Sequence, residues 1–304
     1  RMLNKKQTLF VTIVMNKIIL LSSLLISGFI QGQTNYDEYY SEDELRYEDY
    51  VYQEGILTIK FHPSDNALAM PVIPLYGSQT LLLSFDDLYE DYANYSYTIV
   101  HCNTDWTPSN ILPQQYLSNF SDYYLNEYEY SLNALVPYTH YNLEIPNSNT
   151  RFTKSGNYLL IIYRDDDKDN LVLTRRFFVY EDIVAIGAQV KRATQVDKMN
   201  THQEIDFTLS HTNYTIQNPF QDLHVHLYQN QRWDNVLTSL KPRFVQNQSL
   251  VYNYDDENTF SGGNEFRFFD IKNLQSLTQN VARTVRDSLW YVYLKPEAPR
   301  PISK

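Results

Sequence analysis

Residues 95–110 read YSYTIVHCNTDWTPSN, and this stretch decides how the rest of the chain is interpreted. Its first half alternates strictly, with Tyr95, Tyr97 and Ile99 on one face of an extended strand and smaller residues on the other. Its second half turns polar around Trp106 and ends in a Thr-Pro-Ser-Asn turn. A strand that runs into an aromatic-bearing loop is typical of an antiparallel sandwich. We therefore expect an all-β protein.

The composition supports this reading and excludes several partners. Of 304 residues, 43% are hydrophobic and 15% aromatic, with 27 Tyr and 15 Phe, which favour strands and contact surfaces. The net charge of −11 disfavours nucleic acid and anionic membrane surfaces as partners. Cys102 is the single cysteine, so neither an intramolecular disulfide nor a cysteine-based zinc cluster can form. Its place in an alternating strand predicts a buried thiol.

The N-terminal residues predict export. We expect translation to start at Met15, followed by the basic Lys17 and an apolar run over residues 18–30. This run is shorter than the ~20 apolar residues of a membrane span, so residues 1–32 are interpreted as a signal peptide region. Residues 33–44 are acidic and tyrosine-rich, which predicts a flexible arm. Alternatively, the tyrosines of the arm (Tyr36, Tyr39 and Tyr40) contact a partner.

Turn signals divide the remainder into two strand-rich domains with a boundary at Glu181–Asp182. In residues 45–181 we expect strands over 55–62, 81–85, 95–102, 128–135, 138–145, 156–164 and 171–180, with an edge segment over 71–74. The apolar strand 156–164 is expected to be central. About seven strands in a domain of this size predict an immunoglobulin-like sandwich.

Residues 182–295 predict a second, incomplete sandwich, and residues 296–304 a tail without structure. Strands are expected over 185–191, 204–209, 223–229, 243–246, 249–254, 266–271 and 290–294, with a hairpin turn at Asn247–Gln248. Residues 274–286 predict a short helix or a covered edge strand. The predicted fold class is thus two immunoglobulin-like antiparallel β-sandwich domains in tandem.

Polar clusters carry weak signals for chemistry. Residues 165–170 resemble a calcium loop but lack the glycine and glutamate that such a loop requires, which favours a hairpin turn. His224 and His226 lie on one strand face, but no spacing points to a third metal ligand. Asp86–Asp87, or Glu127 with Glu129, could be a glycosidase pair, but neighbours in sequence are not guaranteed to face each other across a substrate, and a turn explains Asp86–Asp87 better. We therefore expect no enzyme activity, no cofactor and no metal.

Two tryptophans in polar surroundings favour protein binding. Trp106 and Trp233 each lie among turn-forming residues, and Arg232 precedes the second. Tryptophan and arginine are enriched at interface hot spots, so Trp106, Arg232 and Trp233 are the candidate partner-binding residues. Alternatively, each tryptophan covers its own domain core. On these residues alone, the chain could also be an exported module that binds glycan or a cell-surface partner.

Several long strings point to one family. They are LRYEDYVY (45–52), YSYTIVHCNTDWTPSN (95–110), VPYTHYNLEIPN (136–147), TKSGNYLLIIYRDDD (153–167), LTRRFFVYE (173–181), IGAQVKRATQVDKMNTHQEIDF (186–207), IQNPFQDLHVHLYQNQRWDN (216–235) and GGNEFRFFDIKNL (262–274). Together they resemble the plug protein family of the type IX secretion system of Bacteroidota, over nearly all of residues 45–295.

The resemblance implies a function that the residues alone do not. Members of that family are periplasmic, have β-sandwich domains and carry no catalytic residue or cofactor. They bind the periplasmic mouth of the outer-membrane β-barrel translocon and close it when no substrate passes. The resemblance therefore implies a non-enzymatic periplasmic subunit associated with the inner side of the outer membrane. Family members also continue beyond the position of Leu294, from which we expect the second domain to lack strands.

Overall fold

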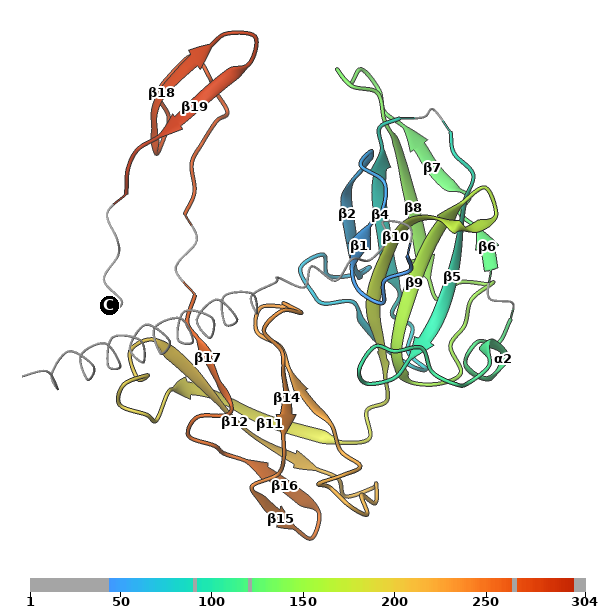
Figure 1. The fold of residues 1–304 in the computed structure, drawn as a ribbon, viewed down its shortest axis with the longest axis vertical. Helices are drawn as coiled ribbons and strands as arrows, with labels where there is room; N and C mark the ends of the chain where they lie inside the picture. Colours follow the sequence, from blue (N-terminus) through green and yellow to red (C-terminus); the bar gives the residue numbers. More distant parts are fainter. Residues whose placement is uncertain (1–43, 90–91, 120–121, 264–266, 298–304) are drawn as a thin grey trace, which may run out of the picture.

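The computed structural model describes residues 44–89, 92–119, 122–263 and 267–297, and these residues form two β domains (Figure 1). The predicted signal peptide and almost all of the predicted N-terminal arm lie outside the described residues. Within the described part of the chain, no helix is both long and apolar enough to span a bilayer.

The larger sheet of the first domain has the strand order β1-β10-β9-β5-β6, with β3 pairing parallel to β10. Its strands are β1 (Tyr50–Val51), β3 (Val72–Pro74), β5 (Tyr95–Cys102), β6 (Asp122–Tyr124), β9 (Gly156–Arg164) and β10 (Asp167–Tyr180). The most apolar strand, β9, lies at the centre of this order, as expected for a strand buried on both faces. A one-turn helix, α2 (Pro113–Tyr116), lies in the connection between β5 and β6.

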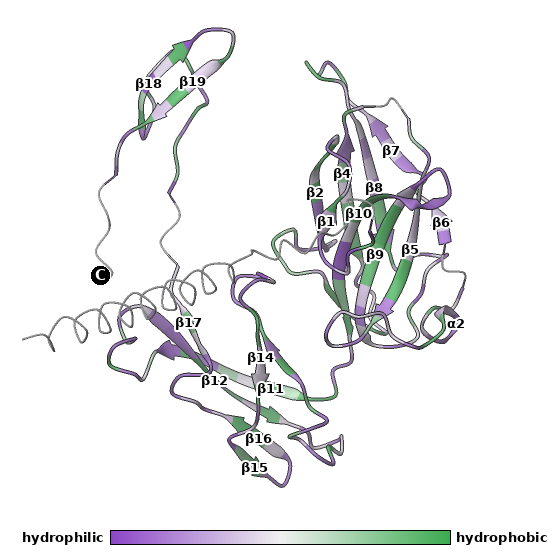
Figure 2. Cartoon of the chain, viewed as in Figure 1, coloured by the Kyte–Doolittle hydropathy of each residue, from purple (hydrophilic) through white to green (hydrophobic). Residues whose placement is uncertain are grey.

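The second sheet of this domain has the order β2-β4-β8-β7 and is antiparallel throughout. Its strands are β2 (Ile56–Pro63), β4 (Leu81–Asp87), β7 (Glu127–Tyr130) and β8 (Thr139–Ile145). The inner faces of the two sheets enclose one core cluster of buried side chains, among them Phe85, Tyr97 and Ile145. The two sheets make a two-layer sandwich. Hydrophobic residues are dense along β9, the central strand of the larger sheet (Figure 2).

Aromatic rings fill much of this core. Tyr158 on β9 is completely buried, with its ring centroid 5.3 Å from that of Phe177 and 5.0 Å from that of Phe152. Its hydroxyl donates a hydrogen bond to the carbonyl oxygen of Lys154 (2.7 Å). The hydroxyl of a buried tyrosine usually finds such a partner, because an unpaired buried hydroxyl costs free energy. The high tyrosine content therefore goes into the core as well as into the surface.

The second domain has a sheet of order β11-β12-β16-β15, with β17 also paired to β12, and a hairpin of β13 and β14. The bounds are β11 (Ala185–Arg192), β12 (His202–Ser210), β13 (Val225–Leu227), β14 (Leu237–Leu240), β15 (Phe244–Gln246), β16 (Ser249–Tyr252) and β17 (Thr259–Ser261). The hairpin packs on the sheet through a small core in which Phe207 and Tyr252 stack at 4.4 Å. The turn at Asn247–Gln248 is confirmed by the pairing of Gln246 with Ser249.

The end of the second domain differs from the prediction. Residues 267–271 form no strand, and residues 281–286, predicted as part of a helix or a covered edge, form strand β18 (Val281–Arg286). β18 pairs with β19 (Trp290–Leu294) in a separate hairpin. β18 contains three β-branched residues and β19 is mostly aromatic, and Leu289, Tyr291 and Tyr293 are exposed. Such residues favour strands, which is why residues 281–286 form a strand here and not a helix.

Cys102 lies under the outer face of the larger sheet, packed with Trp106 and Leu159. Burial raises the pKa of its thiol to about 12. Since the thiolate is the reactive form, we expect Cys102 to resist iodoacetamide at pH ~8 in native buffer and to react fully in guanidinium chloride. Mass spectrometry of the labelled protein checks this, and fast labelling of the native protein would contradict the burial of the thiol.

Candidate interaction surfaces

Trp106 lies on the outer face of the first domain, in the turn that follows β5. Its side chain is only 8% exposed, although its neighbours in sequence are polar. The backbone N–H of Trp106 donates to the carbonyl of Asn103 (3.0 Å), and its φ of 66° is left-handed. This turn folds the indole back onto β9 and β10, where it packs near Leu159 and Leu171.

Trp233 reaches the same place from the second domain. It lies in the loop between β13 and β14, and its ring centroid is 5.3 Å from that of Trp106 and 5.7 Å from that of Phe178. Its indole N–H donates to Oδ2 of Asp49, in the segment that precedes β1 (2.9 Å). The two tryptophans that the sequence singles out are thus brought into contact with each other, across the boundary between the domains.

Arg176 on β10 completes this aromatic cluster. Its guanidinium carbon lies 4.6 Å from the ring centroid of Trp106 and 5.3 Å from that of Trp233. Burial lowers the pKa of Arg176, and the carboxylates of Asp49 and Glu48 oppose that shift. The guanidinium stays charged at any ordinary pH, so the cation–π contact to both rings persists.

Arg232, the third candidate, points away from this cluster. Its Nε lies 2.9 Å from Oδ1 of Asp234, and both side chains are more than half exposed. A surface ion pair of this kind contributes little to stability. Binding of an outside partner by Trp106, Arg232 or Trp233 stays a prediction. The ring faces of the two tryptophans already contact Phe178, Arg176 and each other.

A second surface, absent from the candidate residues predicted from the sequence, lies at one end of the first domain. The connection from β7 to β8 is closed at its base by two hydrogen bonds, from the backbone N–H of Ser131 to the Tyr138 carbonyl and from the N–H of Tyr138 to Ser131 Oγ, both 2.9 Å. Residues 132–137 therefore project beyond the sandwich. Leu132 and Leu135 are almost wholly exposed, and Val136 more than half.

Aromatic rings connect this projection to the core. Tyr141 on β8 is buried and stacks on Phe85 at 5.3 Å. Tyr128 lies 5.8 Å from Tyr141, and Tyr130 lies 5.5 Å from Tyr128. These contacts hold the outer rings on a rigid base while Tyr128 and Tyr130 stay exposed. A surface built on the scaffold in this way presents side chains in one arrangement.

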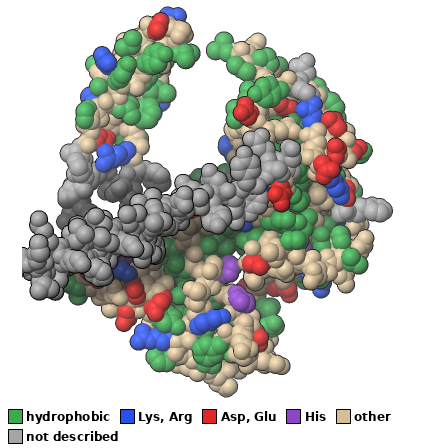
Figure 3. Space-filling view, in the orientation of Figure 1, with side chains coloured by type: hydrophobic (Ala, Val, Ile, Leu, Met, Phe, Trp, Pro, Cys, Tyr) green, Lys and Arg blue, Asp and Glu red, His purple; other side chains and the backbone are tan. Residues whose placement is uncertain are grey.

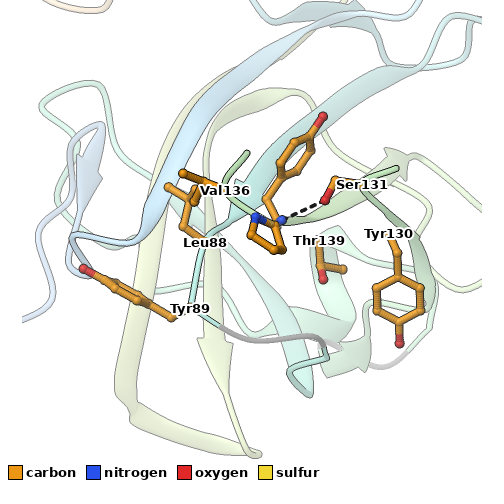
Figure 4. A pocket seen from close by; sticks show the side chains of 8 residues that line it. Leu88, Tyr89, Tyr130, Ser131, Val136 and Thr139 are labelled. Carbon is orange, nitrogen blue, oxygen red and sulfur yellow. Dashed lines mark hydrogen bonds between the residues drawn. The ribbon is translucent and has the colours of Figure 1, made fainter. Parts of the chain in front are cut away.

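We call this surface the rim. Its residues are exposed or line one cavity, and they are Leu88, Tyr89, Tyr92, Tyr128, Tyr130 and residues 131–138. A cavity of about 610 Å³ opens there, lined by Leu88, Tyr89, Tyr130, Ser131, Val136, Pro137, Tyr138 and Thr139 (Figure 4). None of these lining residues is charged. Hydrophobic side chains gather at this free end of the domain (Figure 3).

The composition of the rim is suited to binding. Tyrosine and aliphatic side chains supply contact area at small cost in conformational entropy. Monomeric proteins seldom expose large apolar patches without a partner. From sequence alone, residues 128–135 are predicted as a strand that pairs with residues 138–145. The pairing is observed between β7 and β8, but β7 ends at Tyr130, so the residues after it project as a loop.

The polar clusters of the sequence have structural partners. Asp87 accepts hydrogen bonds from the Tyr95 hydroxyl (2.8 Å) and the Tyr89 N–H (3.0 Å). Asp86 Oδ1 lies 2.5 Å from Nδ1 of His140. Asp165 and Asp166 form the turn between β9 and β10 and have left-handed φ values of 57°. In the described ranges of the chain, no group of three or more His, Cys, Asp or Glu side chains is placed to hold a metal ion.

Three comparisons with known proteins complete the description. Residues 56–181 match the family model described as Type 9 secretion system plug protein 1st domain. A crystal structure of a hypothetical protein from Parabacteroides merdae ATCC 43184 is similar, with a TM-score of 0.76 and 29% sequence identity. That likeness covers 83% of this chain and 64% of the other, so this chain spans less than two thirds of that protein. No curated protein matches the sequence.

Proposed function

Since the chain belongs to the type IX secretion system plug protein family through its first domain, residues 56–181, we propose that it is a non-enzymatic periplasmic subunit that binds and seals the periplasmic mouth of the outer-membrane translocon barrel. The first domain supplies the sealing surface, and the rim is the part of it that enters or covers the opening. Export into the periplasm depends on the predicted signal peptide in residues 1–32.

The rim is the observation that carries this proposal. It sets uncharged, exposed side chains such as Leu132, Leu135 and Val136 at the free end of a rigid sandwich. A seal needs a broad surface that excludes water, which exposed apolar residues provide once they are covered. The barrel mouth is the occupant that family membership favours for such a surface.

Binding of glycan through Trp106 or Trp233 has less support. Carbohydrate stacks on an open aromatic face, and here the two indoles lie edge to face at 90° with Phe178 against both. The packing favours an internal role for these rings.

Deletion of the gene is expected to make the outer membrane permeable, because an unsealed translocon leaves an open pore. The measurement is uptake of a large antibiotic that the intact outer membrane excludes, with restoration by the full chain as the control. A tagged chain is also expected to recover the translocon barrel from detergent extracts. An unchanged barrier in the deletion strain, together with no recovery of the barrel, would overturn the proposal.

A further inference from the structure

The loop from Tyr228 to Asn235 is built to present one side chain, Trp233. Asn230 and Gln231 both adopt left-handed backbone conformations, with φ of 53° and 61°, which turns the chain sharply. The amide of Asn235 donates to the side-chain oxygen of Gln229 (2.9 Å) and closes the loop across its base. Non-glycine residues persist in the left-handed region only where their surroundings hold them there.

The surface that receives Trp233 is equally well prepared. Asp49 Oδ1 accepts a hydrogen bond from the backbone N–H of Arg176 (2.7 Å), which leaves Oδ2 to accept the indole N–H of Trp233. Phe178 stacks against Trp233 with an interplanar angle of 29°. Farther out on the same loop, Nε2 of Gln231 donates to the carbonyl oxygen of Leu68 (2.5 Å). The contacts of Trp233 and Gln231 join the second domain to the first, whereas the bond between Asp49 and Arg176 lies within the first domain.

A second ring of the same loop also contacts the first domain, since the ring centroid of Tyr228 lies 6.1 Å from that of Phe178. Glu181, Asp182 and Ile183 in the connection from β10 to β11 are exposed. The loop contacts the first domain through two large side chains, Trp233 and Tyr228, whereas a permanent interface has a broad apolar core. A contact of this size holds an orientation and can also open.

We propose that the loop 228–235 is a latch. With Trp233 seated between Trp106 and Phe178, the second domain is held in one orientation relative to the first. When Trp233 leaves this position, the domains reorient about residues 181–184. The latch is a property of the chain alone and is the same whatever partner the chain binds.

Pulsed electron–electron resonance between two spin labels tests the latch in the full chain. Lys60→Cys on β2 and Gln189→Cys on β11 place one label on an exposed strand position of each domain. Cys102→Ser is introduced into the parent and every variant, because Trp233 packs against the cluster that buries the Cys102 thiol and its removal would open that thiol to the label. We expect one narrow distance in the parent and a distribution at least twofold wider after Trp233→Ala.

Two further variants keep the test decisive. Trp290→Ala removes a tryptophan of the β18–β19 hairpin and is expected to leave the distribution unchanged. Trp233→Phe keeps a ring but loses the hydrogen bond to Asp49, and an intermediate width is expected; it replaces Trp233→Ala if circular dichroism finds that variant unfolded. A distribution as narrow in the Trp233 variants as in the parent would overturn the latch.

Discussion

Replacing Tyr158 by alanine is expected to lower the free energy of unfolding by about 3–5 kcal/mol, the typical cost of truncating a buried aromatic ring. Tyr158 is completely buried near the start of β9, and its ring contacts Phe152, Phe177 and His101. These neighbours belong to three separate segments: β5, β10 and the segment before β9. Because each is held by its own segment, they are not expected to move together and fill the cavity that alanine leaves. Since small domains are stable by only about 5–15 kcal/mol, this loss is a large fraction of the stability of the first domain.

Guanidinium chloride denaturation followed by circular dichroism measures this change. Tyr158→Phe keeps the ring and loses only the hydrogen bond to the Lys154 carbonyl, so a loss of about 1 kcal/mol is expected. Tyr76→Ala is the matched surface control, because Tyr76 is 82% exposed and its removal leaves no cavity. Equal midpoints for Tyr158→Ala and Tyr76→Ala would contradict the packing described for the core.

The strands of the first domain could be predicted because their signal is local. β5 and β9 have the predicted bounds, and Tyr95, Tyr97 and Ile99 point into the core as the alternation predicts. On the opposite face of the larger sheet, the burial of Cys102 was predicted, but the residues that cover this face could not be. Cys102 and Leu159 are buried there because Leu45, Tyr47 and Trp233 cover them, and these come from distant segments. Coverage of this kind is a tertiary property, which no window along the chain contains.

The candidate binding residues illustrate the same limit. A polar neighbourhood around Trp106 and Trp233 is compatible with an exposed ring or with a ring that covers a core. The local sequence cannot distinguish the two, because the partner of each indole is the other indole, in the other domain. The rim could not be predicted for a different reason. Its apolar residues continue the strand pattern of the residues before them, and they are exposed because β7 ends at Tyr130.

Charge placed on the rim is expected to have the largest effect on function. Leu135→Asp combined with Val136→Asp puts two carboxylates where the proposed seal excludes water, and burying unpaired charges is costly. We expect the affinity for the translocon barrel to fall at least ~100-fold, which corresponds to about 2.7 kcal/mol and is within the range of interface hot spots. The fold should be unaffected, since both side chains are exposed and lie outside the core cluster.

Two measurements check this prediction. One is recovery of the barrel by the tagged double variant, and the other is antibiotic uptake in a strain that carries only this variant. Leu68→Asp is the matched control, because Leu68 is 85% exposed and lies in the loop after β2, away from the rim. Barrel recovery and a tight outer membrane are expected with Leu68→Asp and lost with the rim variant. If the rim variant seals the membrane as well as the parent, the sealing surface lies elsewhere on the first domain, and the apolar projection of residues 132–137 then has another partner.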